Sequence, residues 1–152
     1  MFIHDVCNVL NRHKIAYAIV GGYAVALHGA VRGTVDVDIV IDWTLKNLIN
    51  VENALKELGL VSLLPIDANS LFQFRNEYME KRHLIAWNFY DPKNPAHQVD
   101  IVINYDLKHA HTKTVTTSSG KVKILARNDL IAMKKASGRQ QDLEDVKSLE
   151  SL

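Results

Sequence analysis

The chain has 152 residues, the length of one domain at roughly 150 residues per domain. With 47% hydrophobic residues it can bury a core without disulfides or a structural metal, and its one cysteine, Cys7, excludes an intrachain disulfide. The formal charge of +1 argues against a nucleic-acid partner and against a polybasic membrane anchor. The N-terminus carries no basic leader and the longest apolar run is too short to span a membrane, so we expect a single cytoplasmic domain over residues 1–152.

Hydrophobic periodicity predicts alternating helices and strands in the first part of the chain. Apolar residues at helical spacing indicate helices, and short β-branched runs indicate strands. Two glycines stop the first strand, and Gly29 and Gly59 end the helices that follow. Asp42 is the expected N-cap of the helix after the second strand. The predicted elements are a helix over 3–13, a strand over 15–20, a helix over 23–28, a strand over 34–41 and a helix over 44–58.

Turn residues divide the remainder of the chain. Prolines mark loops around two strands in the middle, and a Ser119-Gly120 turn joins the strands of a hairpin. The predicted elements are strands over 71–74, 83–90 and 97–104, a hairpin over 114–125 and a helical segment over 128–149 that breaks at 137–138, with Asn128 or Asp129 as its N-cap. Because no linker separates two halves, we predict one α+β domain with a mixed sheet flanked by helices.

Three carboxylates occupy apolar strands where core residues would be expected. Asp36 and Asp38 are two apart, so their side chains point to one face, roughly 6.5–7 Å apart along the strand. Asp100 stands alone in the run Val-Asp-Ile-Val-Ile. Neighbouring carboxylates repel each other unless a cation lies between them, and Mg²⁺ prefers carboxylate oxygens together with substrate phosphates. If the two strands pair, the three carboxylates would form a two-metal site for phosphoryl or nucleotidyl transfer; an exposed strand face is the simpler alternative.

Gly21 and Gly22 end the first strand and open the next helix. Glycines there let a phosphate approach the backbone, and the free amides of a helix N-terminus favour anions. A tight turn without a ligand is the alternative interpretation. Arg32 and Thr34 precede the Asp-x-Asp strand and could face the phosphates of a nucleotide, although an arginine can equally clamp a loop.

Together these segments resemble the signature of the polymerase-β-like nucleotidyltransferase superfamily. That signature is a hydrophobic residue and a glycine pair, a spacer, then Asp-x-Asp, with a third carboxylate on a later strand. Here 13 residues separate Gly22 from Asp36, and Asp100 fits the third carboxylate. The detailed pattern, with Arg32-x-Thr34 in the spacer, is similar to the small AbiEii-type and lincosamide-resistance-type nucleotidyltransferases.

The resemblance implies a role for each matching residue in the first two thirds of the chain. Gly21 and Gly22 would contact the triphosphate of an NTP. Asp36 and Asp38 would hold Mg²⁺, and Asp100 would complete the site as a metal ligand or general base.

Three residues near the C-terminus extend the resemblance. Lys134 is similar to the family lysine that reaches the nucleotide phosphates, and Arg139 and Asp142 resemble the Arg-x-x-Asp that follows that lysine. Read without the resemblance, Lys134 would lie on a solvated helix face, and Arg139 and Asp142 would form a surface i, i+3 pair.

The implied activity is Mg²⁺-dependent transfer of NMP from an NTP to a hydroxyl of an acceptor, which is either a small molecule or a protein. The acceptor site would come from residues 60–95, from a second copy of the chain or from a second protein. Aromatic residues of that segment could line it, but are as readily core residues: Phe74, Tyr78, Trp87 and Tyr90. The alternative is a non-catalytic component of a toxin–antitoxin-type pair that binds an NTP or a partner. A Mg²⁺-dependent hydrolase fits less well, because of the spacing from the glycine pair to Asp-x-Asp.

Overall fold

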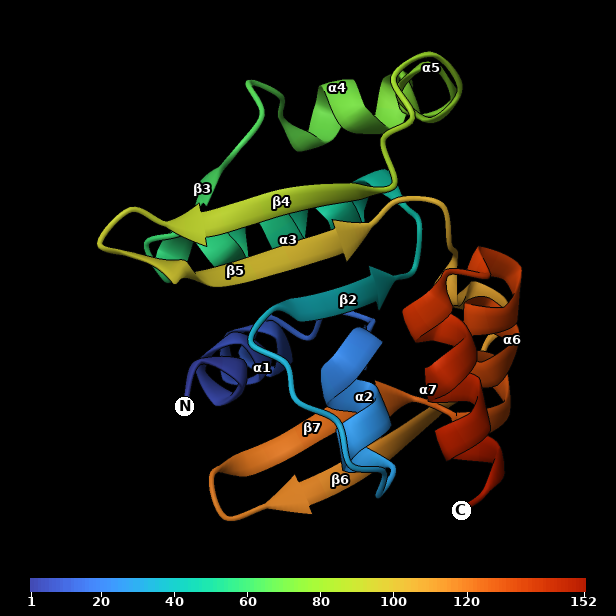
Figure 1. Ribbon diagram of the computed structural model, residues 1–152. Helices are drawn as coiled ribbons and strands as arrows, with labels where there is room; N and C mark the ends of the chain where they lie inside the picture. The colour runs from blue at the N-terminus through green and yellow to red at the C-terminus, as the bar shows by residue number, and fades with distance from the viewer.

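The computed structural model describes residues 1–152 as one seven-stranded mixed sheet with helices on both faces (Figure 1). The helices are α1 (Phe2–Arg12), α2 (Gly21–Leu27), α3 (Leu45–Glu57), α4 (Ala68–Gln73), α5 (Arg75–Lys81), α6 (Arg127–Ser137) and α7 (Gln140–Glu150), with one 3-10 turn, η1 (Leu107–His109). The strands are β1 (Tyr17–Val20), β2 (Val37–Ile41), β3 (Val61–Ser62), β4 (Ala86–Asp91), β5 (Asn94–Val102), β6 (Thr112–Thr117) and β7 (Gly120–Leu125). The expected α+β architecture is confirmed.

The strand order is β3-β4-β5-β2-β1-β7-β6. Strand β1 pairs antiparallel to β2 and parallel to β7, while β2 pairs parallel to β5. The parallel pairing of β2 with β5 is the one on which the carboxylate prediction depends. It places Asp38 directly opposite Asp100.

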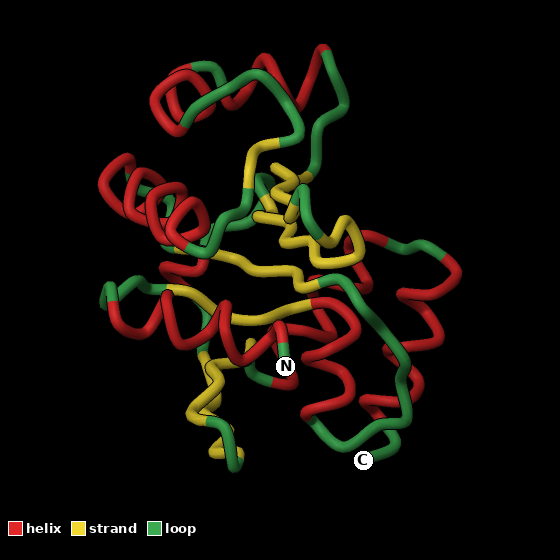
Figure 2. Tube along the Cα trace, turned by 90° about the vertical axis from the view of Figure 1, so that its left-hand side faces the viewer, coloured by secondary structure: helices red, strands yellow, loops and turns green.

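The helices form two layers around the sheet, which Figure 2 shows edge-on. Helices α1 and α3 lie behind the sheet in the view of Figure 1, and α2, α6 and α7 lie in front of it. Amphipathic α1 buries one stripe of apolar residues, Ile3, Val6, Cys7 and Leu10, because these positions recur at helical spacing. The central strands are buried on both faces, as their nearly continuous apolar composition predicts. No helix is long and apolar enough to cross a membrane.

The predicted strand over 71–74 is wrong, because this segment is helical. Helix α4 begins after Asp67, whose carboxylate accepts a hydrogen bond from the Ser70 backbone at 2.8 Å, and it buries Ala68 and Leu71 one turn apart. The N-cap signal at Asp67 therefore outweighs the apolar composition of Leu71–Phe74.

Other predicted boundaries also shift. Strand β2 begins at Val37, so Thr34 and Asp36 precede it. Thr44, not Asp42, caps α3, and its hydroxyl accepts the Asn47 backbone N–H at 3.1 Å. Helix α6 begins after Ala126 without a side-chain cap, whereas Asp129 accepts the His111 backbone N–H instead.

The turns signalled by glycine are confirmed. Strands β6 and β7 form the predicted hairpin, with Thr117 paired to Gly120. Gly138 adopts φ 66° and separates α6 from α7, as a residue in the left-handed region does at a helix end. This break turns α7 back along α6, so that the two helices pack together beside β2 (Figure 1).

We expect Cys7 to resist thiol reagents in the folded protein. Its side chain is fully buried, and burial raises the pKa of the thiol to about 11. At about pH 8, roughly one thiol in a thousand would be a thiolate. A disulfide reagent should label the denatured chain fully and the native chain only at the rate of unfolding. Equal rates in the two states would contradict the packing of α1 against the sheet.

Candidate active site

Asp38 and Asp100 form the centre of the site. They are direct partners on neighbouring parallel strands, where backbones lie about 4.8 Å apart, and both side chains are half-buried. The charge of Asp100 acts on the Asp38 carboxyl. The strand of Asp100 pairs beside the strand of Asp38, the condition on which the carboxylate prediction depends.

The two carboxylates disturb one another electrostatically. Burial and the charges of Asp100 and Asp36 raise the pKa of Asp38 to about 7, and the charge of Lys134 only partly opposes this rise. A divalent cation between the carboxylates would remove this repulsion, because carboxylate oxygens are the ligands that Mg²⁺ prefers. The donor chemistry of this pair therefore fits the metal that the sequence predicts.

Asp36 stands apart from the pair. It lies on the connection before β2 and is exposed, although its charge reaches Asp38. No group of three or more His, Cys, Asp and Glu side chains is gathered as a metal site. The role of Asp36 as a third ligand stays a prediction.

The glycine pair lets α2 approach the strand carboxylate. Gly21 has φ +70°, and a Cβ there would lie 2.1 Å from Asp38 Oδ2. A Cβ on Gly22 would lie 2.7 Å from the Cβ of Thr34. Asp38 and Thr34 therefore leave no room for a side chain at Gly21 and Gly22, whether or not a phosphate binds there. Contact of the glycines with a triphosphate remains a prediction.

Lys134 is buried among carboxylates and does not lie on a solvated face. Its Nζ lies 2.8 Å from Asp145 Oδ2 and 3.7 Å from Asp142 Oδ1. Asp145 also accepts a hydrogen bond from Arg32 Nε at 3.0 Å. The i, i+3 pair expected from the sequence is present, with Arg139 Nε 2.8 Å from Asp142 Oδ2, at the start of α7. The charges of Lys134 and Arg139 both reach Asp38, so α6 and α7 border the carboxylate pair.

Sequence reasoning missed two polar residues at the site. Asn88 of β4 lies opposite Asp100 and donates from Nδ2 to Asp100 Oδ1 at 2.9 Å, which orients that carboxylate. Asp145 holds Lys134 of the preceding helix and Arg32, which lies 113 positions away in sequence. Only strand register could have revealed Asn88. The repetition of Asp at 142 and 145 on one helix was a usable signal for Asp145.

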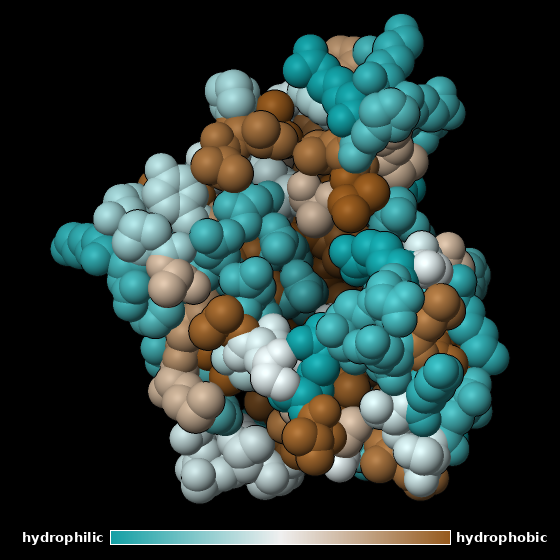
Figure 3. All heavy atoms as spheres, viewed as in Figure 1, coloured by the Kyte–Doolittle hydropathy of each residue, from teal (hydrophilic) through white to brown (hydrophobic).

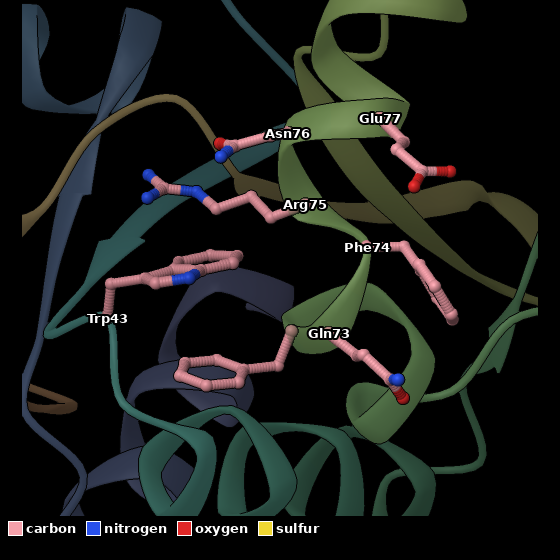
Figure 4. Close-up of a pocket in the computed structure, with 7 residues that line it drawn as sticks. Trp43, Gln73, Phe74, Arg75, Asn76 and Glu77 are labelled. Carbon is pink, nitrogen blue, oxygen red and sulfur yellow. The ribbon is translucent and has the colours of Figure 1, made fainter.

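The segment 60–95 forms a separate pocket, shown in Figure 4. The cavity of about 430 Å³ lies between the β2–α3 connection and helices α4 and α5. Arg75 Cζ lies 4.3 Å from the centre of the Trp43 ring, which is nearly parallel to the ring of Phe72. Trp43 lies beyond the end of β2, whereas Asp38 lies near its beginning.

Of the four aromatics considered for an acceptor site, only Phe74 lines this pocket. Trp87 is a core residue whose Nε1 donates to Ser62 Oγ. Phe74, Leu63 and Ile85 are exposed, and Figure 3 shows hydrophobic residues over the neighbouring segment between β3 and α4. Over α6 and α7, Figure 3 shows mostly hydrophilic residues with hydrophobic ones among them.

Several solved structures have the same overall architecture as this chain. The antibiotic-resistance factor ANT(2'')-Ia matches with a TM-score of 0.64 and 11% identity, over 97% of this chain and 80% of that chain. The lincosamide antibiotic adenylyltransferase LnuA, bound to lincomycin, matches at 0.61 and 16%, over 95% and 91%. The chain has the nucleotidyltransferase fold. An antigenic nucleotidyltransferase-like protein from Paracoccidioides brasiliensis matches at 0.56 and 21%, over 97% and 72%. No family model and no curated protein matches the sequence.

Replacing Gly21 by alanine should destabilise the protein strongly. Alanine at φ +70° is strained, and its Cβ would displace the Asp38 carboxylate. We expect a loss of about 1–3 kcal/mol, or very roughly 2–10 °C in Tm. Gly33→Ala is the matched control, since nothing lies within 4 Å of its Cβ position and it should cost about 0.5 kcal/mol or less. Equal losses in thermal unfolding would contradict the close approach of α2 to β2.

Asp38→Asn should not destabilise the metal-free protein near pH 8. Folded Asp38 keeps its proton up to about pH 7, whereas an unfolded Asp loses it near pH 4. Because the folded state binds more protons in this window, the stability contributed by Asp38 falls as the pH rises through it. Relative to wild type, the variant should therefore gain stability between about pH 4 and pH 8 in urea unfolding with a chelator. If the variant were much less stable than wild type at both pH 4 and pH 8, Asp38 would be a structural residue.

Proposed function

We propose that the chain is a nucleotidyltransferase that transfers NMP from an NTP to an acceptor hydroxyl by Mg²⁺-dependent, two-metal chemistry. The observation that carries the proposal is the pairing of Asp38 with Asp100 beside the glycine pair. A non-catalytic binding protein has no need of two unmatched carboxylates in a half-buried position, since their repulsion costs stability. The nucleotidyltransferase fold agrees with this assignment.

In this proposal Asp38 and Asp100 would hold Mg²⁺, with Asp36 as a further ligand. Bound there, Mg²⁺ would supply positive charge to the α-phosphate and to the leaving pyrophosphate. The acceptor oxygen attacks the α-phosphorus in line, the bond from that phosphorus to the bridging oxygen breaks, and pyrophosphate leaves. A carboxylate takes the hydroxyl proton, and Asp100, oriented by Asn88, is the candidate base. Lys134, Arg32 and Arg139 supply positive charge to the phosphates, with Gly21, Gly22 and Thr34 beside them.

The acceptor is a small molecule or a protein. Of the proteins with this fold, ANT(2'')-Ia has been solved with adenylyl-2''-tobramycin and LnuA with lincomycin. These examples favour a small-molecule acceptor. Asp38 lies near the start of β2, whereas the pocket at Trp43 lies past the end of this strand. The attacking hydroxyl must therefore approach from outside this pocket.

Transfer is tested by incubating the protein with Mg²⁺, cell lysate and each NTP labelled at the α-phosphorus. The label should appear on an acceptor, whereas label at the γ-phosphorus should not, because pyrophosphate leaves. Asp38→Asn should abolish the transfer, and Glu144→Gln, an exposed change on α7, should not. Transfer of the γ label would identify a kinase and overturn the proposal.

Metal and nucleotide should bind cooperatively, because the carboxylates repel a triphosphate until a cation neutralises them. A hundredfold excess over Kd stabilises the folded state by about 2.7 kcal/mol. At this chain length we expect a Tm increase of roughly 5–10 °C with NTP and Mg²⁺ together. NTP with a chelator should give little change, and Asp36→Ala/Asp38→Ala should lose the joint effect. Equal shifts with and without Mg²⁺ would contradict the metal site.

A further inference from the structure

A single carboxylate on α7 joins three segments beside the candidate active site. Asp145 is 2% exposed. It accepts hydrogen bonds from Lys134 Nζ at 2.8 Å, from Arg32 Nε at 3.0 Å and from Gln141 Nε2 at 3.0 Å. Lys134 belongs to α6 and Arg32 to the connection between α2 and β2, so Asp145 fixes two cations that no local structure would bring together.

Stability alone is a weak reason for a buried cluster of charges such as this one. Burying charges costs several kcal/mol per ion, and apolar side chains of similar volume often stabilise a protein as well or better. Asp145 stays ionised despite its burial. Burial alone would raise the pKa of Asp145, but the hydrogen bonds from Lys134 and Gln141 and the charge of Lys134 outweigh this effect and lower the pKa. The arrangement therefore fixes where two positive charges lie.

Lys134 acts on the carboxylate pair, and Arg32 stands on the connection that leads into β2. Lys134 is close enough to Asp38 for its charge to act on that carboxyl. Arg32 lies two residues before Thr34, whose side chain packs against Gly22. Lysine has three ammonium donors and arginine five guanidinium donors, so each retains donors after its bond to Asp145. Arg32 also donates from Nη1 to the Gly33 carbonyl at 2.6 Å, which further fixes its side chain.

We propose that Asp145 is a positioning residue that aims Lys134 and Arg32 at the polyphosphate of the bound NTP. The inference rests on the proposed function, because it requires an NTP at the Asp38–Asp100 pair. Asp145 lies behind the two cations and does not itself touch the nucleotide. A phosphate that displaced Asp145 would predict the opposite outcome, since removal of the carboxylate would then strengthen binding.

The test measures the affinity of wild type and Asp145→Asn for Mg²⁺ complexes of ATP, GTP, CTP and UTP, and for the nucleoside of the tightest binder. Asn has the shape of Asp without its charge. We expect NTP affinity to fall by roughly tenfold or more, the scale of a lost charge-assisted hydrogen bond, with nucleoside affinity unchanged. If Asp145 were merely structural, the affinities for the NTP and for the nucleoside would fall together. Glu144→Gln, the exposed neighbour on α7, is the matched control and should match wild type for both.

A second measurement tests whether Asp145 acts through the two cations. In a Lys134→Met/Arg32→Met background, Asp145→Asn should have almost no further effect on NTP affinity, because there is nothing left to position. Effects that add fully would overturn the inference. Asp145→Glu, which keeps the charge but moves it by one methylene, should shift NTP affinity in the same direction as Asn, and serves if the Asn variant does not fold.

The outcomes separate the two proposals. A wild-type protein that binds no NTP with Mg²⁺ overturns the proposed function, and this inference with it. A wild type that binds NTP while Asp145→Asn binds equally or more tightly overturns only the role of Asp145.

Discussion

The structure around the site depends on one electrostatic constraint, which is that two carboxylates lie side by side on neighbouring strands. Asp38 and Asp100 are in register because β2 and β5 are parallel, and the surrounding strand residues are buried. Hydrophobic burial holds the two strands together, and this pairing keeps the two carboxylates close despite their mutual repulsion. Burial, together with the charges of Asp100 and Asp36, raises the pKa of Asp38. Gly21 brings α2 close to this carboxylate because it has no side chain to keep the helix away.

Much of this could be predicted from local sequence. The β-branched composition around Asp38 and Asp100 predicted both strands, and the carboxylates inside them pointed to the candidate site. Glycine signalled the turn at 119–120 and the break at Gly138, because these positions need backbone conformations that other residues avoid. Local reasoning failed at 71–74, where Asp67 starts a helix through a side-chain bond three residues ahead. Apolar composition alone does not distinguish a short strand from a short helix.

The remaining site residues depend on long-range register. Asn88 reaches Asp100 only because β4 pairs antiparallel to β5, and Asp145 meets Arg32 across 113 positions of sequence. The Asn88 contact has no local signature, since an isolated Asn in a strand is common on surfaces, and the repeated Asp on α7 signals Asp145 without naming Arg32 as its partner. Lys134 is the instructive case. Its resemblance to a phosphate-binding lysine predicted a site near the nucleotide, but its burial between Asp142 and Asp145 follows from the turn at Gly138.

The charges of the site fall into two groups that are paired in different ways. On α7, Asp142 and Asp145 are matched by Lys134, Arg32 and Arg139. On the sheet, Asp38 and Asp100 take part in no salt bridge, and Asn88 gives Asp100 a neutral donor. A phosphate needs fixed cations, and a divalent cation needs carboxylates that no lysine or arginine already neutralises. The carboxylates of α7 hold Lys134 and Arg139, whose charges act on Asp38 without forming a salt bridge to it. This separation gives the proposed NTP and its Mg²⁺ distinct partners within one site.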